Sequence, residues 1–452
     1  MAPSTFTPPP QPLADNFRDL HPPLTRDAAA EEAARCLFCH DAPCVRACPT
    51  SIDVPRFIRQ ILHRNPAGAA ETILDANVLG GSCARACPTE VLCEGACVER
   101  ALGLPAISIG RLQRFATDHA RDNNLTFFEA GADTGRRVAV IGSGPAGLAC
   151  AHGLRRLGHA VTMFEARATP GGLNTLGIAV YKLTAPESLQ EIGQILDIGG
   201  IDLRLNAPVD AAQLEEMLAE YDAVFLGVGL GATAGLRLPG EDIPGVWEAL
   251  AFIRQLHHLP YDRCEVGRRV VVLGCGNTAM DAATQAVLLG AEHVTIAYRR
   301  SEADMSAYTH EYELAKSDGV GFHWHVTPAE FVADPATARV SGVRFAAGPG
   351  GDGFTLNCDM VIMALGQSPL AELTAGLTDP AAPGQVAIDR ATGATGMTGL
   401  FAGGDCSGGG REIVYAVADG KRAARGIDAY LSSTTAQSST TPGTNAADRR
   451  NP

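Results

Sequence analysis

Eight of the thirteen cysteines of this chain lie between Cys36 and Cys97, and the other five are dispersed along the rest of the sequence. The spacing is C-x2-C-x4-C-x3-C-P from Cys36 to Cys48, and C-x3-C-P-x4-C-x3-C from Cys83 to Cys97. Thiolates at such short intervals, with Cys-Pro endings, are typical of the loops that bind four-iron clusters in ferredoxins. Eight thiols would suit two [4Fe–4S] clusters.

A pair of structural zinc sites is the main alternative for these cysteines, since zinc knuckles also use closely spaced thiols. The x4 and x3 spacings and the two Cys-Pro pairs fit zinc knuckles poorly. A disulfide framework would require an oxidising compartment, and nothing in the sequence indicates one. We therefore predict iron–sulfur clusters.

A second chemical pattern is a glycine-rich turn between a strand and a helix. Residues 138–141 read as a buried strand, and the sequence GSGPAG follows it and opens an Ala-rich helix. In such a turn the first glycine permits the tight bend, the second lets a pyrophosphate approach the backbone, and the third lets helix and strand pack closely. A carboxylate at the end of the next strand can accept hydrogen bonds from ribose hydroxyls. The residues predicted to bind a dinucleotide here are Gly142, Ser143, Gly144, Pro145, Ala146, Gly147 and Glu165.

Two further segments favour a flavin over a nicotinamide at this first turn. The residues Gly172 and Leu173 follow soon after the acidic residue, and the sequence LFAGGD precedes a helical segment near the C-terminus. Backbone amides at Gly404 and the carboxylate of Asp405 can reach a ribityl chain, and the N-terminus of the following helix can face a ring carbonyl. The sequence therefore predicts FAD, against the simpler interpretation of glycines in an ordinary strand-to-helix turn.

The glycine turn is repeated about 132 residues later as GCGNTA, with alanine in the third position. The strand after it ends in Tyr298-Arg299-Arg300, where an NAD site usually carries an acid, and guanidinium groups suit a 2′-phosphate. A solvated strand end is the alternative for the two arginines, and Cys275 is interpreted as a small packing residue. The predicted nicotinamide-binding residues of this turn and strand are Gly274, Cys275, Gly276, Asn277, Thr278, Arg299 and Arg300.

The order of electron flow follows from the chemistry of these groups. A nicotinamide passes two electrons together as hydride, clusters accept one electron at a time, and a flavin can do both. The flavin must therefore lie between the nicotinamide and the clusters. No side chain is assigned a catalytic role, since the cofactors carry the chemistry.

These sites require an α plus α/β architecture, with an all-helical two-cluster domain followed by two Rossmann-like domains. The segment VPRFIRQILHRN, for example, places its apolar residues near one helical face. The FAD-binding domain is interrupted by the NAD(P)-binding domain. The expected boundaries are a disordered arm at 1–24, the helical Fe–S domain at 25–125, the FAD-binding domain at 126–246 and 365–431, the NAD(P)-binding domain at 247–364, and a disordered tail at 432–452.

The overall composition excludes several classes of protein. Acidic residues outnumber basic residues by 50 to 36, which argues against a surface for nucleic acid or anionic membrane. The sequence contains neither an uninterrupted apolar run of about 18 residues nor a secretory signal at its N-terminus. We therefore expect a cytoplasmic protein that binds neither nucleic acid nor membrane.

At this point the sequence resembles a known family. The segments CLFCHDAPCVRACPTSIDVPRFI, GSCARACPTEVLCEGACVER and ISIGRLQRFA, together with both glycine turns, are similar to the flavin and iron–sulfur portion of dihydropyrimidine dehydrogenase. The similarity includes the stand-alone electron-input subunit of the bacterial two-subunit enzyme. The glutamate synthase small subunit has the same architecture. The resemblance covers about residues 25–430.

The resemblance corrects the simple count of eight thiol ligands. It implies that the position of Cys83 is not a ligand and that a glutamine, Gln113, completes the second site. Glutamate synthase small subunits typically have glutamate at that position, so Gln113 favours the pyrimidine enzyme. The implied ligands are Cys36, Cys39, Cys44 and Cys97 for the first cluster, and Cys48, Cys87, Cys93 and Gln113 for the second.

With the resemblance in view, we assign further residues to the two nucleotide sites. The additional residues expected at FAD are Lys182, Leu230 and Ile413, and those expected at the nicotinamide nucleotide are Ala364, Leu365 and Gly366. In relatives that use NADP, a third arginine follows the arginine pair, and Ser306 occupies the matching position here. We therefore expect NADH to be favoured, with NADPH possible.

The resemblance also implies a partner. In the single-chain pyrimidine enzyme an FMN-carrying barrel reduces the base, and such a barrel needs about 250 residues. The two nucleotide units occupy this chain beyond residue 126, so we expect electrons to pass to an FMN-containing partner subunit that reduces uracil or thymine. The alternatives are a glutamate synthase small subunit, an NAD(P)H:ferredoxin-type oxidoreductase, and a docking scaffold that has lost nicotinamide chemistry.

Overall fold

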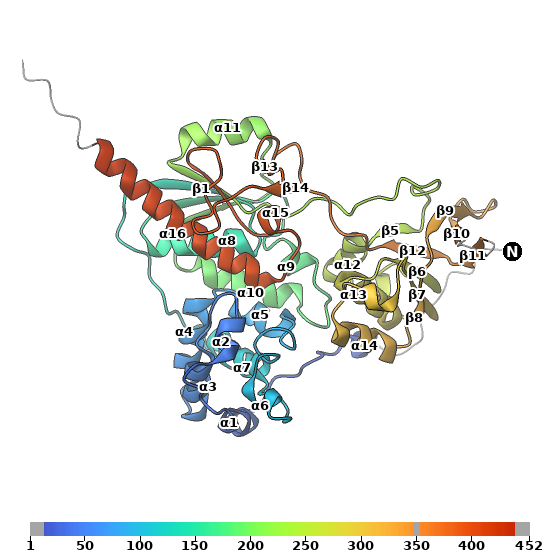
Figure 1. The fold of residues 1–452 in the computed structure, drawn as a ribbon, viewed down its shortest axis with the longest axis horizontal. Coiled ribbons are helices and arrows are strands. Elements are labelled where there is room, and N and C mark those ends of the chain that lie inside the picture. Colours follow the sequence, from blue (N-terminus) through green and yellow to red (C-terminus); the bar gives the residue numbers. More distant parts are fainter. Residues whose placement is uncertain (1–12, 347–352, 439–452) are drawn as a thin grey trace, which may run out of the picture.

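The computed structural model describes residues 13–346 and 353–438, and these residues form three units (Figure 1). A helical N-terminal unit lies beneath the first of two α/β units, and the second α/β unit lies to one side of both. Within the described residues no helix is long and apolar enough to cross a membrane. The architecture is the expected combination of α and α/β.

The N-terminal unit is a compact group of short helices around one apolar cluster. Asp53 caps the helix α3 by accepting a hydrogen bond from the backbone N–H of Arg56 at 3.1 Å. The helix then buries Phe57, Ile58 and Ile61, so the expected apolar face is present. The helices of this unit are α1 (Arg26–Ala34), α2 (Pro43–Ala47), α3 (Val54–Leu62), α4 (Pro66–Ala76), α5 (Gly80–Ala86), α6 (Val98–Ala101) and α7 (Ile109–Asp122).

The first α/β unit contains a five-stranded parallel sheet with the order β15-β4-β1-β2-β3. Its last strand comes from the C-terminal part of the chain, so the sheet closes only after the second α/β unit has been inserted. Its elements are β1 (Arg137–Ile141), α8 (Pro145–Arg156), β2 (Ala160–Phe164), α9 (Leu173–Leu176), α10 (Ala185–Leu196), β3 (Ile201–Arg204), α11 (Ala211–Glu220), β4 (Ala223–Leu226), β13 (Thr378–Asp379), β14 (Ala382–Val386), β15 (Leu400–Ala402), α15 (Asp405–Gly408) and α16 (Ile413–Ser438).

The second α/β unit repeats the arrangement with the strand order β5-β12-β6-β7-β8 and adds a three-stranded antiparallel sheet, β11-β10-β9. Its elements are β5 (Val246–Glu248), α12 (Ala249–His258), η2 (Tyr261–Arg263), β6 (Arg269–Leu273), α13 (Asn277–Leu288), β7 (His293–Ala297), η3 (Glu302–Asp304), α14 (Thr309–Ser317), β8 (Gly321–His323), β9 (Pro328–Ala333), β10 (Val340–Phe345), β11 (Phe354–Asn357) and β12 (Met360–Met363).

The chain passes between the two α/β units twice, and the two passages run side by side. The backbone N–H of Gly231 donates to the carbonyl of Ser368 at 2.7 Å, and that of Ala234 donates to the carbonyl of Gly366 at 2.9 Å. Such pairing fixes both connections together. The inserted unit is therefore joined to its host by a short two-stranded connection.

The N-terminal segment differs from the prediction of a disordered arm. Residues 13–17 form a 3-10 helix, η1 (Leu13–Phe17), and the ring of Phe17 packs 4.2 Å from that of Tyr261 in the second α/β unit. The side chain of Asn16 donates to the carbonyl of Leu288 at 2.9 Å. Buried apolar groups and backbone hydrogen bonds hold this segment in place, which the Pro-rich composition did not reveal. Residues 1–12 lie outside the described residues.

After η1, the same segment crosses to the helical unit. Asp19 pairs with Arg114 of α7 at 2.5 Å, Arg114 also donates to the carbonyl of His21 at 2.8 Å, and Leu20 donates to the carbonyl of Tyr181 at 3.2 Å. Residues 13–22 thus form a strap that touches all three units. At the other end, α16 continues to Ser438, so the tail predicted to be disordered from residue 432 is helical up to residue 438; residues 439–452 are outside the described part.

We expect Phe17→Ala to release this strap. Phenylalanine-to-alanine changes at buried positions cost about 3 kcal/mol or more of stability. Here the loss cannot exceed the free energy that holds the strap against the other units. Backbone amides of residues 13–22 should then exchange with solvent at least about tenfold faster in hydrogen-exchange mass spectrometry. Leu102→Ala, at a side chain that is 64% exposed, is the control and should leave that exchange unchanged. Equal protection in all three proteins would contradict the strap.

Candidate redox sites

The four cysteines assigned to the first cluster line one pocket of the helical unit. Cys36, Cys39, Cys44 and Cys97 share it with apolar side chains from the same unit, such as Ile58. Burial raises the pKa of Cys44 to about 11, and the neighbouring thiols of Cys36 and Cys97 add to that rise. Free thiolates are therefore unfavourable here, and a cationic iron–sulfur core would supply the missing compensation.

The cysteines assigned to the second cluster also approach one another. A hydrogen bond with Cys83, burial, and the charges of Cys93 and Cys48 all raise the pKa of Cys87 well above that of a free thiol. Burial likewise raises the pKa of Cys93, and Cys48 again contributes. Four thiols thus meet at this site, because Cys83 of α5 lies beside Cys87. The contact between these two thiols does not by itself exclude Cys83 as a ligand.

Gln113 is buried on α7, and its side-chain nitrogen donates to the carbonyl of Gly80 at 2.7 Å. This hydrogen bond fixes the amide and engages its nitrogen, which leaves the oxygen as the atom that could bind iron. Throughout the described part of the chain, no group of three or more His, Cys, Asp or Glu side chains is placed to hold a single metal ion. The chemistry of the donors, many thiols around a space, fits clusters.

The first glycine turn, between β1 and α8, has the geometry that the sequence predicts. Gly142 has φ +96°, and a Cβ there would lie 2.4 Å from the carbonyl oxygen of Gly227. A Cβ on Gly147 would lie 1.9 Å from the carbonyl oxygen of Gly142, so the helix can approach the strand only with glycine. By contrast, a Cβ on Gly144 would meet no protein atom within 4 Å. This open space at a helix N-terminus fits a pyrophosphate.

Glu165 lies at the end of β2 and is held by the glycine turn itself. One carboxylate oxygen accepts hydrogen bonds from Ser143, from the backbone N–H at 3.1 Å and from the hydroxyl at 2.6 Å. The other oxygen accepts from the backbone N–H of Arg167 at 2.9 Å. A carboxylate can accept further bonds beyond these three, so its expected role toward ribose hydroxyls is compatible with this arrangement.

The two distant segments assigned to the flavin do come to this turn. A Cβ on Gly172, which has φ +57°, would lie 3.3 Å from Cα of Gly144, and one on Gly404 would lie 2.9 Å from Cβ of Ala146. Burial raises the pKa of Asp405 to about 6, although it accepts a hydrogen bond from the backbone N–H of Arg411 at 3.1 Å. The carboxyl can therefore hold a proton close to neutral pH.

Two residues of α16 that position this segment were missed from the sequence. The carboxylate of Asp419 accepts a hydrogen bond from the backbone N–H of Gly404 at 3.1 Å. A Cβ on Gly420 would lie 2.1 Å from the carbonyl oxygen of Ala146, so α16 approaches α8 closely only because that residue is glycine. A glycine in the middle of a long predicted helix was the available signal, since glycine there has a cost that packing must offset.

Three other residues assigned to FAD are placed less directly. Ile413 is the first residue of α16, and Leu230 lies near Gly410, in the segment leading into that helix. Lys182 instead points to the second α/β unit, where it donates to Asp281 at 2.7 Å and to Glu311 at 2.5 Å.

These two carboxylates keep Lys182 charged and raise its pKa, against the effect of burial. A cavity between the three units reaches from Lys182 to Cys87. The lysine therefore lies between the units, at the gap between the flavin domain and the second cysteine set, and not at the glycine turn.

The second glycine turn, between β6 and α13, is built like the first. Gly274 has φ +120°, and a Cβ there would lie 2.2 Å from the carbonyl oxygen of Ala364 at the end of β12. Ser306 packs against this turn, because its backbone N–H donates to the carbonyl of Cys275 at 3.2 Å. Cys275 is 2% exposed, in agreement with a packing role. Asn277 uses its side-chain oxygen to accept from the backbone N–H of Tyr308 at 2.9 Å.

The remaining residues assigned to the nicotinamide nucleotide surround the same edge of the sheet. Thr278, Arg299 and Arg300 are exposed, and neither arginine side chain forms a hydrogen bond or an ion pair within the described part of the protein. Leu365 and Gly366 follow β12 and lead into the connection between the units. The two guanidinium groups are thus available to a nucleotide phosphate.

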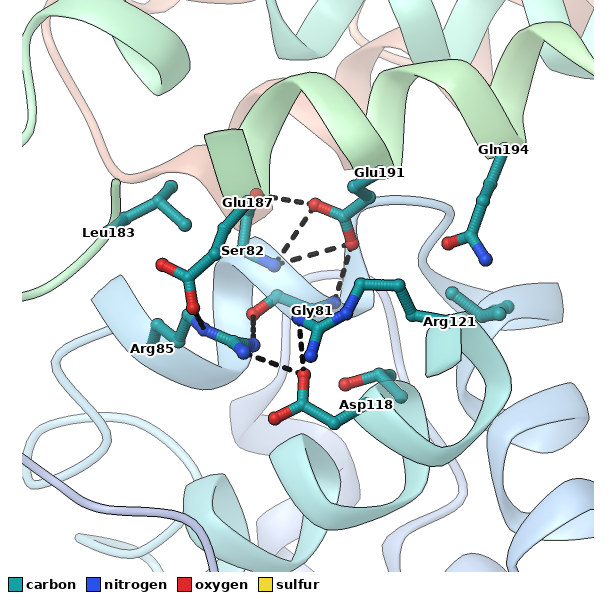
Figure 2. A pocket seen from close by; sticks show the side chains of 11 residues that line it. Gly81, Ser82, Arg85, Asp118, Arg121, Leu183, Glu187, Glu191 and Gln194 are labelled. Atoms are coloured by element: carbon teal, nitrogen blue, oxygen red, sulfur yellow. Dashed lines mark hydrogen bonds and ion pairs between the residues drawn. The ribbon is translucent and has the colours of Figure 1, made fainter. Parts of the chain in front are cut away.

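Buried charged side chains hold the helical unit against the flavin unit (Figure 2). Glu191 of α10 accepts hydrogen bonds from the backbone N–H groups of Gly81 at 2.6 Å and Ser82 at 3.0 Å, and also from the Ser82 hydroxyl. Beside it, Arg85 of α5 pairs with Asp118 at 2.6 Å and with Glu187 at 3.1 Å. The helix α5, which carries Cys83 and is capped by Cys87, is therefore fixed against the flavin domain.

The fold and these sites define a flavin- and nicotinamide-dependent oxidoreductase with an N-terminal iron–sulfur domain. Residues 13–125 match the family model described as dihydropyrimidine dehydrogenase domain II, 4Fe-4S cluster. Residues 136–420 match the model described as pyridine nucleotide-disulphide oxidoreductase. The chain belongs to the pyridine nucleotide-disulphide oxidoreductase family, and it is an NAD(P)H-dependent flavin and iron–sulfur oxidoreductase.

Two curated relatives share both parts of the chain. The chain is 36% identical to the NAD-dependent dihydropyrimidine dehydrogenase subunit PreT of Salmonella typhimurium, over 93% of this chain and 98% of that protein. It is 34% identical to the glutamate synthase [NADPH] small chain of Escherichia coli K12, over 92% of this chain and 94% of that protein.

Solved structures share the α/β fold. FprA of Mycobacterium tuberculosis in complex with NADPH aligns with a TM-score of 0.55 and 20% identity, over 68% of this chain and 87% of that one. Thioredoxin reductase of Lactococcus lactis aligns with a TM-score of 0.54 and 22% identity, over 66% of this chain and 99% of that one.

Proposed function

We propose that this chain is the electron-input subunit of an NAD-dependent dihydropyrimidine dehydrogenase. It takes a hydride from NADH onto FAD and passes single electrons through two [4Fe–4S] clusters to an FMN-containing partner subunit. That partner reduces uracil or thymine to the 5,6-dihydropyrimidine. FAD supplies the conversion between two-electron and one-electron transfer.

The main support for the proposal is that the cysteines form two separate groups in the structure. One set shares a pocket built only from the helical unit, and the other set meets beside α5. The second set is the one that faces the flavin unit, because Cys87 lines the cavity that also contains Lys182. This arrangement supports the order nicotinamide, FAD, second cluster, first cluster.

The FMN-carrying barrel of the pyrimidine enzyme is assigned to a partner subunit. A barrel for FMN needs about 250 residues. Between residues 137 and 438, the described elements belong to the two nucleotide-binding units and leave no such barrel. We assign pyrimidine reduction to a separate subunit because this chain matches 98% of the length of its relative PreT. The similarity to PreT, whose name describes it as a subunit, supports this assignment.

The direct experiment separates electron input from pyrimidine reduction. The purified holoprotein should contain FAD and about eight irons per chain, and it should oxidise NADH with an artificial dye. It should not oxidise NADH in response to uracil until the FMN-containing subunit of a bacterial dihydropyrimidine dehydrogenase is added. Uracil-dependent NADH oxidation by the isolated chain would contradict the proposal.

A glutamate synthase small subunit is the second candidate, supported by the relative at 34% identity. Gln113 favours the pyrimidine enzyme, since glutamate is typical of the small subunits at that position. The two candidates differ in the partner that restores activity. If a glutamate synthase large subunit restores glutamine-dependent NAD(P)H oxidation and the FMN-containing subunit does not, this second candidate is correct.

The arginine pair provides a test of nucleotide choice. If Arg299 and Arg300 bind a 2′-phosphate, Arg299→Ala/Arg300→Ala removes charge-assisted hydrogen bonds worth about 1.5–3 kcal/mol each. The KM for NADPH should then rise at least about tenfold, while the KM for NADH should change little. Steady-state kcat/KM for both nucleotides measures this, and the wild type should use NADH at least as well as NADPH because Ser306 replaces a third cation. If the double variant changes neither nucleotide, the arginines are only a solvated strand end.

A further inference from the structure

The outer surface of the helical unit contains a groove next to the first set of cysteines. One wall is formed by residues 38–40, and the other is formed by α3 and the turn that follows it up to Asn65. We call it the Cys39 groove, because the side chain of Cys39 lines both this groove and the pocket shared by the first cysteine set. It is therefore a place where that set approaches the surface.

This groove faces away from the nucleotide-binding units. The helix α3 packs on α1, α4 and α7 of its own unit, whereas α5 and α7 are the helices that touch α10 of the flavin unit. Figure 1 shows α3 toward the end of the molecule opposite the flavin sheet. An electron that has reached the first set would therefore leave on this side.

The groove carries positive charge in a chain whose net charge is −14. Arg56, Arg59 and His63 follow one another at helical spacing on the exposed face of α3. Neither arginine has an ion-pair partner within the described residues, and the Arg59 guanidinium lies 5.0 Å from the ring centre of Phe38. The lining of the groove contains these two arginines and one carboxylate, Asp53, which caps α3.

We propose that the Cys39 groove is the surface through which this chain delivers electrons to an acceptor protein that presents an acidic face. The proposal rests on the proposed function, in which the first cysteine set holds the last cluster of the chain. A cluster held by Cys36, Cys39, Cys44 and Cys97 would be oxidised by one electron at a time as the acceptor is reduced. Charges at the rim of such an interface raise the association rate and make binding sensitive to salt.

The proposal explains why Arg56 and Arg59 have no ion-pair partner within the described residues. A surface with two guanidinium groups that lack ion-pair partners within the described residues attracts acidic partners. The rival explanation is that the arginines offset the negative charge of the cluster itself. The two explanations differ in one measurable property, because an offsetting charge sets the reduction potential of the cluster, whereas a docking charge sets the affinity for the partner.

The test uses Arg56→Glu/Arg59→Glu in the holoprotein, with Arg263→Glu/Arg390→Glu as a control of equal charge change at exposed arginines of the other units. Binding to the FMN-containing subunit of a bacterial dihydropyrimidine dehydrogenase is titrated calorimetrically at low and high salt. We expect the groove variant to bind at least about tenfold more weakly at low salt, with a smaller salt dependence. The control, and the charge-conserving Arg56→Lys/Arg59→Lys, should bind like the wild type.

Two measurements on the same proteins decide between the explanations. NADH oxidation with a dye should be unchanged in the groove variant, and any shift in the midpoint potentials of the clusters should be accompanied by the loss of binding. Unchanged binding, an equal loss in the control, or shifted potentials with normal binding would each overturn the proposal.

If the wild type does not bind the FMN-containing subunit, the proposed function fails, and the groove is tested with small acceptors. Reoxidation of the reduced protein by ferricyanide should then slow at least about tenfold in the groove variant, while hexaammineruthenium(III) should react faster. Equal rates with both ions would overturn the groove as the exit.

Discussion

Cys87→Ala should remove about four irons per chain and lower electron delivery to the partner subunit at least about a thousandfold. Cys87 lies at the meeting point of the second cysteine set and lines the cavity shared with Lys182 of the flavin unit. In the proposed order of electron transfer, loss of a cluster there interrupts the route between FAD and the first set. Oxidation of NADH by a small dye needs only the flavin, so it should stay within about twofold of the wild type.

Cys83→Ala is the matched control for this prediction. Cys83 and Cys87 are one helical turn apart, and the backbone N–H of Cys87 donates to the carbonyl of Cys83 at 3.0 Å. If Gln113 is the fourth ligand, Cys83→Ala should keep about eight irons and most of its electron delivery. Iron and acid-labile sulfide analysis of the two variants provides the comparison. If Cys83→Ala loses four irons as Cys87→Ala does, eight thiols hold the clusters, and Gln113 is not a ligand.

The sequence predicted those parts of the molecule in which local chemistry and backbone geometry coincide. Both glycine turns lie between a strand and a helix, as the sequence predicts. The roles of Gly142 and Gly274 depend on a positive φ, which is a property of the local backbone. The presence of two Rossmann-like units follows from the repeat itself, whereas the strand orders of the two sheets come from the structure. The fold class was therefore accessible before any coordinates.

Contacts between the units were not accessible in this way. The sequence shows Lys182 as one cation and does not show that Asp281 and Glu311, about a hundred residues later, enclose it. The strap was missed for the same reason, since the composition of residues 1–24 predicts disorder and only the pocket beside Tyr261 makes burial of Phe17 favourable. Long-range packing overrode local composition at both places.

For the cysteine ligands, the sequence indicates the kind of site but not which of the eight thiols bind iron. Spacing alone gave eight equivalent thiols, and the structure places Cys83 beside Cys87. The choice of Gln113 over Cys83 came from a resemblance. The structure adds that the Gln113 nitrogen donates to the carbonyl of Gly80, which leaves the amide oxygen without that bond.

Gly144→Ala should abolish FAD binding without unfolding the protein. An alanine Cβ at Gly144 meets no protein atom within 4 Å, and the backbone there, with φ −68° and ψ 179°, suits any residue. The added methyl group would instead occupy the space at the N-terminus of α8 where a pyrophosphate must approach the backbone. We expect the affinity for FAD to fall at least about a hundredfold, measured by fluorescence titration of the deflavinated protein.

Gly193→Ala is the matched control, because its Cβ also meets nothing within 4 Å but lies on α10 away from the turn. Replacing a helical glycine with alanine stabilises a helix by about 1 kcal/mol, so this variant should bind FAD normally and melt no earlier than the wild type. Gly147→Ala gives the opposite pattern to Gly144→Ala, since its Cβ would lie 1.9 Å from the carbonyl oxygen of Gly142 and should destabilise the apoprotein itself. Normal FAD affinity in Gly144→Ala would mean that the dinucleotide does not cross the first glycine turn.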